Sequence, residues 1–427
     1  MRANLLFPYQ AAGAEQLAKS DRLYLGDMPG LGKSRTALSA AHRAGVKALH
    51  VLCPAVVRAH WRREHAVMGY GYDLHVESYQ RYVVSEAARR PFLFGRRSTV
   101  ALVLDEAHFL KHAASRRTQL ILETGTGLAH GYGRVWPLSG TPLPRNAAEM
   151  FPILLALWPE KLQARGVETY PAFLDRYCQW RPTKYGPRVF GLKNADELHA
   201  LVSSVMLRRR VRDVLPDLPP LRWGVVTIEA VPGDAMNTVY ELENGVRTRA
   251  AILEGELPPV DESLARYRHA VGDAKAPAAA ELVQDELDAD EAVKRVVFAY
   301  HRSVLDYLEN ALRRYGVSRV DGSVTGAKRE AELHNFARGP NRVFLGQLQA
   351  CATGLDGLQY GAHDAVLVEP DWATDVNVQA GRRVSRIGST LPGLARMLAL
   401  AGTLDEAIIR NHHREVHIVE QALGETT

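Results

Sequence analysis

Cysteine and long apolar runs are both scarce in this sequence. Its three cysteines, Cys53, Cys178 and Cys351, are far apart and have no Cys-x-x-Cys spacing. We therefore expect neither a disulfide framework nor a cysteine zinc site. The longest apolar runs, such as residues 151–158, are too short to cross a bilayer. The N-terminal residues lack the long apolar segment of a signal peptide, so we expect a cytoplasmic protein.

The chain also lacks a strong excess of either charge. Its net charge is +5, with 24% charged and 46% hydrophobic residues, which is typical of a globular protein. This mild basic excess permits a nucleic-acid partner without requiring one. A length of 427 residues predicts two or three domains, and no repeat of fixed period is visible.

Short apolar runs alternate with helical stretches in both halves of the chain. The runs are continuous rather than alternating, which is typical of buried parallel strands. They occupy residues 22–27, 47–54, 99–107 and 134–140, and then 295–302, 317–323, 341–347 and 364–370. The charged, helix-rich segment between them follows a boundary at residues 215–223. We expect an α/β fold with two parallel-sheet domains, at residues 1–225 and 293–427, joined by a helical connector at 226–292.

A glycine-rich segment, GDMPGLGKS at residues 26–34, separates the first expected strand from a helix. Such glycines let backbone N–H groups turn toward an anion at the helix N-terminus. Lys33 is then placed to reach the β- and γ-phosphates of a nucleotide, and the Ser34 hydroxyl to hold Mg²⁺. The strict phosphate-loop pattern has glycine at the position of Asp27. The alternative is a strand-to-helix turn with a surface lysine.

An acidic pair, Asp105 and Glu106, comes directly after an apolar strand. A carboxylate at this end of a strand holds Mg²⁺ in nucleoside triphosphatases, and Glu106 is placed to orient the attacking water. The alternative is a helix N-cap followed by a first-turn acid. Lys33 in the same domain favours the metal site. Further along, Ser139 and Thr141 flank a glycine after another strand, where hydroxyls can sense the state of a phosphate.

The second half contributes an arginine cluster in the segment QAGRRVSRIG, residues 379–388. Arg383 and Arg386 are three residues apart and can share one helical face. An arginine aimed at the γ-phosphate stabilises charge in phosphoryl transfer. The alternative is a solvated basic face.

These segments, in this order, resemble the Swi/Snf-like ATPases of helicase superfamily two, and most closely the HARP-type annealing-helicase branch. The family also carries aspartate at the Asp27 position. The matching segments cover nearly the whole chain: residues 7–17 (Q motif), 25–34 (motif I), 52–64 (Ia), 76–80 (Ib), 104–111 (II), 138–154 (III), 206–221 (the arginine-rich exit), 296–312 (IV), 353–372 (V) and 379–388 (VI). The chain departs from the family in motif V, which reads GLDGLQ, and in motif VI at Gly381, Arg382 and Ser385.

The resemblance implies two RecA-like domains in tandem that use ATP and Mg²⁺. It carries over several sets of site residues. Catalysis falls to Lys33, Asp105, Glu106, Arg383 and Arg386; nucleotide binding to Gln10, Asp27, Gly30, Leu31, Gly32, Lys33, Ser34, Gly354 and Asp356; Mg²⁺ to Ser34 and Asp105; coupling to His108, Ser139 and Thr141; and DNA contacts to Pro54, Trp61, Ser78, Lys111, His301 and Arg302.

The activity that the resemblance implies is a DNA-dependent ATPase that translocates on duplex or forked DNA without reading its sequence. A protein partner for targeting is compatible with it. One alternative is a strand-separating DNA or RNA helicase of the same superfamily. A non-catalytic DNA-binding scaffold and a small-molecule kinase are further alternatives, and each leaves part of the motif set unexplained.

Overall fold

The computed structural model describes residues 6–93, 99–143, 145–183, 186–229, 233–245, 262–351 and 355–425. Its contacts divide the chain into two compact units. The first unit comprises Met1–Leu215 and His417–Thr427, and the second comprises Pro216–Val416. The division falls inside residues 215–223, the segment that the sequence indicates as a boundary.

A parallel sheet of six strands forms the centre of the first unit, in the order β3-β2-β4-β5-β1-β8. Its central strand β4 has every residue buried, which explains its continuous apolar sequence. The edge strand β3 alternates between more exposed and less exposed residues. The strands are β1 (Tyr24–Leu25), β2 (Ala48–Cys53), β3 (Asp73–Ser78), β4 (Val100–Asp105), β5 (Arg134–Leu138) and β8 (Met206–Leu207).

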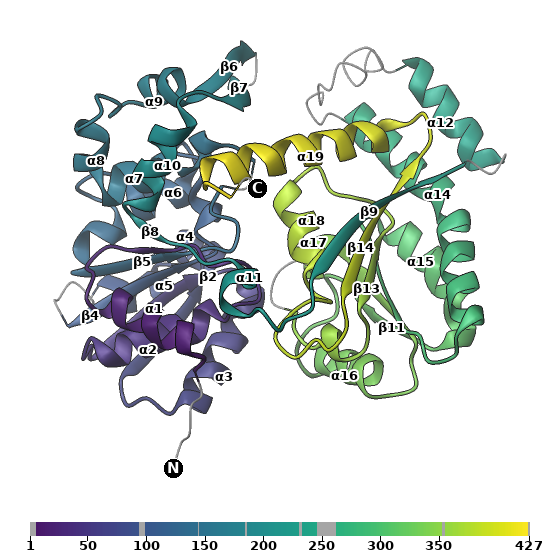
Figure 1. Cartoon of the computed structure of the whole chain (residues 1–427), viewed down its shortest axis with the longest axis horizontal. Helices are drawn as coiled ribbons and strands as arrows, with labels where there is room; N and C mark the ends of the chain where they lie inside the picture. The colour runs from purple at the N-terminus through teal and green to yellow at the C-terminus, as the bar shows by residue number, and fades with distance from the viewer. Residues whose placement is uncertain are drawn as a thin grey trace. The chain divides into compact units, whose positions relative to one another are not determined.

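Helices cover both faces of this sheet (Figure 1). One face packs against α1 (Pro8–Ala18), α2 (Lys33–Arg43) and α3 (Arg58–Met68). The other face packs against a larger helical layer that includes the end of α19 (Leu404–Ala422). That layer contains α4 (Tyr79–Val84), α5 (Glu86–Leu93), α6 (Arg116–Leu122), α7 (Phe151–Leu157), α8 (Pro159–Gln163), α9 (Tyr170–Tyr177) and α10 (Ala195–Ser203).

The first unit also contains several smaller elements. An antiparallel hairpin is formed by β6 (Cys178–Thr183) and β7 (Gly186–Leu192). Short helical turns are η1 (Ala55–Val57), η2 (Ala107–Leu110), η3 (Leu128–Gly131), η4 (Ala147–Met150) and α11 (Val211–Val214).

The second unit is built on another six-stranded parallel sheet, in the order β11-β12-β10-β13-β14-β9. The predicted end of the first domain, residue 225, lies within β9, which pairs with β14 at the edge of this sheet. The strands are β9 (Leu221–Ile228), β10 (Arg295–Ala299), β11 (Val317–Val320), β12 (Val343–Gln347), β13 (Asp364–Leu367) and β14 (Gly393–Leu400).

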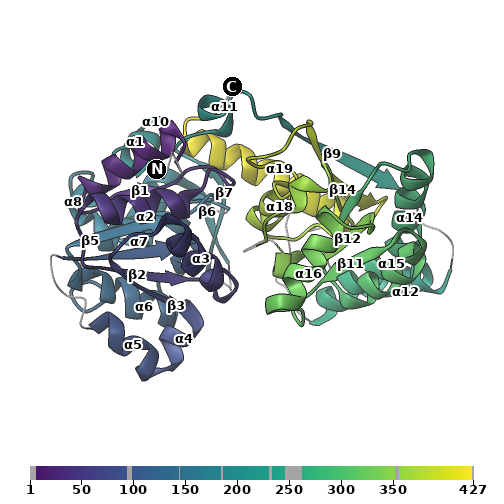
Figure 2. The same ribbon diagram turned by 90° about the horizontal axis from the view of Figure 1, so that it is seen from below.

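The helices of the second unit also lie on both faces of the sheet, as Figures 1 and 2 show. One face packs against α14 (Glu262–Ala289) and α15 (Arg302–Leu312), and the other against α16 (Gly326–Ala337), α17 (Leu348–Cys351) and α18 (Thr374–Gly381). The expected helical connector contains α12 (Asp234–Gly245) and α14, which share a small core with the first turns of α19. Short turns are η5 (Arg313–Tyr315) and η6 (Leu358–Tyr360).

The predicted α/β class is therefore confirmed, and each unit has an all-parallel central sheet between two helical layers. No helix in the described parts of the chain is long and apolar enough to span a membrane.

Candidate functional site

A glycine-rich loop connects β1 to the N-terminus of α2. Gly30 and Gly32 have φ angles of 91° and 72°, in the left-handed region that glycine adopts without strain. A Cβ atom on Gly32 would lie 2.4 Å from Nε2 of Gln10, so α1 closes directly over the loop. The loop thus leads into a long helix whose first N–H groups are available to an anion.

Helix α1 holds the loop through its side chains. Gln10 Nε2 and the Tyr9 hydroxyl each donate to the Leu31 carbonyl oxygen at 3.0 Å. The backbone N–H of Phe7 donates to Gln10 Oε1 at 3.0 Å, which fixes the orientation of the amide. The structure therefore brings two expected nucleotide-binding residues, Gln10 and Leu31, into direct contact.

Lys33 is the first residue of α2, and its ammonium group is enclosed by the loop. Lys33 Nζ donates to the Asp27 carbonyl oxygen at 3.0 Å. Burial lowers the pKa of Lys33, while the charges of Glu106, Asp27 and Asp105 oppose this effect. The interpretation of Lys33 as a surface lysine is wrong, because the side chain lies among these carboxylates.

Asp105 ends β4, and both of its carboxylate oxygens accept hydrogen bonds. Trp61 Nε1 donates to Oδ2 at 2.7 Å, and the Glu106 backbone N–H donates to Oδ1 at 3.0 Å. Burial and the neighbouring Glu106 carboxylate raise the pKa of Asp105 to about 7, although the Trp61 bond and Lys33 lower it. The Asp105 carboxylate is thus poorly compensated within the protein, as expected for a group that meets a cation only when ligand binds.

Glu106 has a φ of 50°, which is uncommon for a residue other than glycine. It precedes η2, and its side chain makes no capping hydrogen bond there, so the helix-cap alternative does not describe it. The three expected coupling residues gather around it. His108 Nδ1 lies 2.9 Å from Ser139 Oγ and 3.3 Å from Glu106 Oε2, and Ser139 Oγ accepts the Thr141 N–H at 3.1 Å.

Two arginines that sequence reasoning did not single out complete this constellation. Arg209 donates from Nε to Asp27 Oδ1 at 2.8 Å, and its second nitrogen pairs with Oδ2 of the same wholly buried carboxylate. Its other terminal nitrogen donates to the Tyr9 carbonyl oxygen. Arg208 contacts the carbonyl oxygens of Gly26 and Gly140. The sequence does contain a signal for this ion pair. An aspartate buried in the loop needs a cationic partner, and three arginines occur at residues 208–210.

In the second unit, Arg383 and Arg386 both donate to the carbonyl oxygen of Leu355. The expectation that they share a helical face is wrong, because α18 ends at Gly381 and both arginines lie in the turns that follow. They share a partner instead.

Asp356 lies beside this arginine pair, and its Oδ1 accepts from Arg386 Nη1 at 3.3 Å. Burial raises the pKa of Asp356, but Arg386, Gln359 and Arg383 outweigh this effect and leave it lowered. Gly354, the other motif V residue expected to bind nucleotide, lies outside the described residues.

Three of the residues expected to contact DNA have buried side chains: Pro54, Trp61 and Ser78. Ser78 Oγ caps α4 by accepting the Arg81 N–H at 3.2 Å, and Trp61 is wholly enclosed against Asp105. These side chains are not available to a DNA strand in this structure. A contact at these positions would have to come from the backbone.

The other three DNA candidates differ in exposure. Lys111 pairs with Glu149 at 3.2 Å and is 13% exposed, and His301 Nδ1 lies 2.6 Å from Glu369 Oε1 with 18% exposure. Arg302, at the start of α15, has a side chain that is 59% exposed. Arg302 is therefore the candidate best placed to meet a phosphate.

Two protein-family models match the sequence of this chain. The model of the SNF2-related domain matches residues 18–235, and the model of the helicase conserved C-terminal domain matches residues 278–388. The first matched region contains the glycine-rich loop of Lys33 and the acidic pair Asp105 and Glu106. The second contains Arg383 and Arg386.

Two curated relatives are similar in sequence. One is the SWI/SNF-related matrix-associated actin-dependent regulator of chromatin subfamily A-like protein 1 of Xenopus tropicalis, 27% identical over 98% of this chain and 45% of the relative. The other is the human DNA annealing helicase and endonuclease ZRANB3, 28% identical over 76% of this chain and 30% of the relative. The chain thus spans less than half the length of these relatives.

Among solved structures, the chain is similar to the Sulfolobus solfataricus SWI2/SNF2 ATPase core in complex with dsDNA. The identity is 20%, the TM-score is 0.43, and the match covers 98% of this chain and 93% of the other. Because the SNF2-related model alone covers half of the sequence, the chain belongs to the SNF2-related family of helicase-type ATPases.

Proposed function

We propose that this chain is a DNA-dependent ATPase that couples ATP hydrolysis to translocation on duplex or forked DNA. The observation that carries the proposal is the position of Lys33. Its ammonium group opens α2 at the end of a glycine-rich loop and interacts with Asp27, Asp105 and Glu106. A partly buried cation at a helix N-terminus, next to an acidic pair that ends a parallel strand, suits the binding and cleavage of a phosphoanhydride.

The loop and α2 would hold the phosphates of ATP. The first N–H groups of α2 would donate to phosphate oxygens, and Lys33 would exchange its bond to the Asp27 carbonyl for one to the nucleotide. Gln10 and Leu31, joined at 3.0 Å, would link adenine recognition by α1 to the shape of the loop.

Ser34 and Asp105 would hold Mg²⁺, because a hydroxyl and a carboxylate are the hard oxygen ligands that this ion prefers. When bound, Mg²⁺ supplies positive charge that offsets the charge of the phosphate oxygens. A raised Asp105 pKa fits this assignment, since the carboxylate lacks a full cationic partner of its own. Trp61 would orient the Asp105 carboxylate through its hydrogen bond.

Glu106 would orient the attacking water and receive its proton. Its carboxylate is held near His108 and Ser139, so a change at the γ-phosphate would be transmitted to the Thr141 turn. Arg383 and Arg386 would add positive charge at the γ-phosphate, and their common partner, the Leu355 carbonyl, would orient both side chains.

DNA would bind through phosphate contacts, with Arg302 as one of them, and with an affinity that falls as salt rises. The names of the two curated relatives, which refer to chromatin and to DNA annealing, support DNA as the substrate class. A protein partner for targeting is also compatible with the exposed surface.

The test is ATP hydrolysis by the purified chain with no nucleic acid, duplex DNA, forked DNA, single-stranded DNA and single-stranded RNA. We expect strong stimulation by duplex or forked DNA and loss of hydrolysis in Lys33→Ala. Stimulation by single strands or RNA alone would instead favour the strand-separating helicase. Hydrolysis that is absent in every condition, with DNA binding retained, would favour a scaffold.

Two arginines at opposite ends of α15 provide a matched pair for the DNA contact. Arg302 is the first residue of the helix and Arg313 follows its last residue, and both are exposed. We expect Arg302→Ala to weaken DNA stimulation and to reduce the slope of log affinity against log salt by about one. Arg313→Ala should leave both quantities unchanged, and equal effects of the two variants would contradict a specific contact.

A further inference from the structure

Arg208 joins three segments of the first unit that are far apart in sequence. Its Nη1 donates to the Gly26 carbonyl oxygen at 2.6 Å, where the glycine-rich loop begins, and to the Gly140 carbonyl oxygen at 3.4 Å. On its other side, Nε and Nη2 donate to the two carboxylate oxygens of Glu425 at 2.6 and 3.2 Å. A single guanidinium group therefore links the loop, the turn after β5 and the C-terminal segment.

The C-terminal segment, residues 417–425, is firmly built into the first unit. Ala422 and Leu423 belong to its hydrophobic core. Gly424, with a φ of 64°, passes so close to His199 of α10 that an added Cβ would lie 2.5 Å from the imidazole ring. The Glu425 backbone N–H donates to the Glu420 carbonyl oxygen at 2.7 Å. Glu425 thus holds a fixed position relative to Arg208.

The ion pair is shielded from water, because the side chains of Arg208 and Glu425 are 14% and 12% exposed. It is also bidentate, which restricts the guanidinium to one orientation. A pair of this kind contributes more than an exposed one, for which solvent screening and side-chain entropy remove most of the gain.

Arg208 holds one backbone group on each side of Lys33, one in the loop and one in the turn after β5. Gly26 precedes Asp27, whose carbonyl accepts the Lys33 hydrogen bond. An added Cβ on Gly140 would lie 3.1 Å from Lys33 Nζ, so the Gly140 turn forms the other wall around the ammonium group. The two carbonyl groups that Arg208 holds therefore belong to the two backbone segments that enclose Lys33.

We propose that Glu425 holds Arg208 against Gly26 and Gly140, and that this contact positions the glycine-rich loop for nucleotide. Arg208 and Glu425 are positioning residues, since they act through backbone groups and not on the phosphates. The proposal rests on the proposed function of the loop and extends the nucleotide site to the C-terminal segment. Without Glu425, a buried guanidinium group would lose its carboxylate and its fixed orientation, and the two walls would separate.

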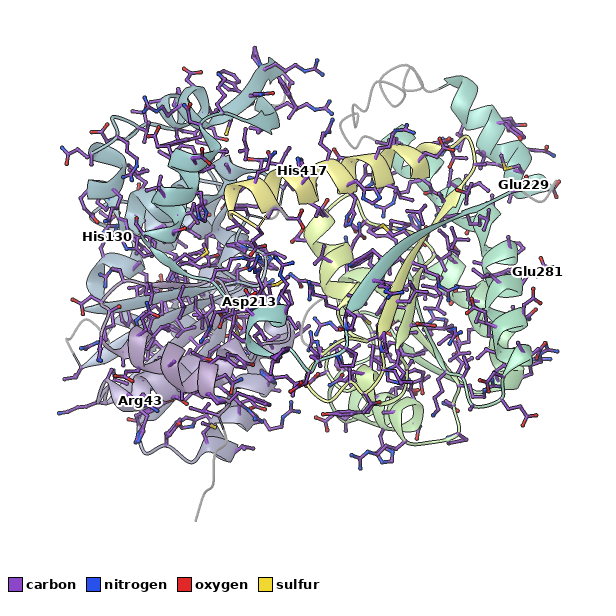
Figure 3. All side chains as sticks on the ribbon, in the orientation of Figure 1. Arg43, His130, Asp213, Glu229, Glu281 and His417 are labelled. Carbon is purple, nitrogen blue, oxygen red and sulfur yellow. The ribbon has the colours of Figure 1, made fainter. Side chains whose placement is uncertain are left out.

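The neighbouring Arg210 supplies a matched control. It pairs with Asp213 through two hydrogen bonds of 2.6 and 3.0 Å, but both side chains are partly exposed and these bonds do not involve the loop. Figure 3 labels Asp213 on α11 and His417 at the start of the C-terminal segment. Asp213→Asn therefore removes the carboxylate partner of the adjacent, more exposed arginine and leaves the hydrogen bonds between Arg208 and Glu425 in place.

The experiment measures the dissociation constant of a fluorescent ADP analogue by equilibrium titration, together with the KM and kcat for ATP and the Tm. We expect Glu425→Gln and Arg208→Lys each to weaken nucleotide binding about five- to tenfold and to raise KM more than they lower kcat. The double variant should be no weaker than either single variant, because both remove the same contact. Asp213→Asn should bind as the wild type does.

Several outcomes would overturn the proposal. One is wild-type affinity in Glu425→Gln; another is a lowered Tm with unchanged affinity per folded molecule, which would make the pair purely structural. Additive losses in the double variant would show that the residues act separately. Nucleotide binding by the wild type without stimulation by DNA would refute the proposed function alone. A wild type that binds no nucleotide would overturn both.

Discussion

Replacing Asp105 with asparagine should abolish hydrolysis and yet stabilise the protein at alkaline pH. Burial and Glu106 raise the pKa of Asp105 from 3.8 to about 7. The folded state therefore prefers the protonated carboxyl, whereas the unfolded state ionises at its ordinary pKa. As pH rises from about 4 to 7, the folded state binds more protons than the unfolded state, so this group lowers stability progressively across that range.

The size of the effect follows from the shift. A change of roughly three pKa units corresponds to about 4 kcal/mol of lost stability above pH 7, of which about 2 kcal/mol is already present at pH 5. Asparagine cannot ionise, so it removes this electrostatic loss of stability. However, both Asp105 carboxylate oxygens accept N–H donors, from Trp61 and Glu106. One of those donors would face the new NH₂ group, which costs about 1–3 kcal/mol at every pH. A net gain of about 1–3 kcal/mol therefore remains at pH 8.

Thermal unfolding of the wild type and Asp105→Asn, followed at pH 5 and pH 8 without nucleotide or divalent cations, measures this difference. Titration of groups distant from Asp105 is common to both proteins, so the change in their Tm difference reports on Asp105 and on the Glu106 and Lys33 charges that interact with it. We expect the variant to gain stability relative to the wild type by about 2–3 kcal/mol between pH 5 and pH 8. A Tm difference that does not depend on pH, or that falls toward pH 8, would refute the electrostatic account of Asp105.

Three further substitutions probe the same constellation. Trp61→Phe removes the N–H donor to Asp105, so the pKa of Asp105 should rise further. The acidic limb of the plot of kcat/KM against pH should then move to higher pH by about 1–2 units. An unmoved limb would contradict the role of Asp105 in hydrolysis. Arg209→Met leaves Asp27 buried without its partner and should cost about 3–5 kcal/mol in chemical denaturation, much of it recovered by adding Asp27→Asn. Gly32→Ala places a Cβ 2.4 Å from the Gln10 amide nitrogen, on a residue whose φ is 72°. It should raise the dissociation constant for ADP about tenfold in an equilibrium titration. Wild-type affinity in this variant would refute the reasoning.

Most of the strands predicted from the sequence lie inside the two sheets, although residues 317–323 contain the edge strand β11, and the internal strand β14 was not predicted. β4 and β10 are buried on both faces, so their residues form continuous apolar runs that periodicity detects. β3 and β9, at sheet edges, alternate between exposed and less exposed residues, and β9 also lies in the proline-rich segment taken as a boundary. Edge strands carry a weaker signal because only one of their faces needs to be apolar.

The candidate site was predictable where chemistry and short-range sequence coincide. Lys33 follows its glycines directly, and Glu106 follows Asp105, so each local pattern named its residues. Trp61 was harder, because its bond to Asp105 joins positions 44 residues apart, and an aromatic residue near a strand end has many uses. Arg208 depends on a partner 217 residues away, and no local pattern connects it to Glu425.

Two buried carboxylates near Lys33 show how the fold separates a structural charge from a functional one. Asp27 is wholly buried and is held by two nitrogens of Arg209. Arg209 is a permanent cation, and its hydrogen bond to the Tyr9 carbonyl oxygen of α1 helps to keep it in place. Among the described residues, the Asp105 carboxylate is hydrogen-bonded only to neutral N–H groups, those of Trp61 and Glu106, and its pKa is raised. A fixed partner at Asp27 keeps the loop in one shape, whereas a fixed partner at Asp105 would compete with an incoming cation. Their different partners therefore suit the loop to a constant geometry and Asp105 to the proposed exchange of Mg²⁺ with each nucleotide.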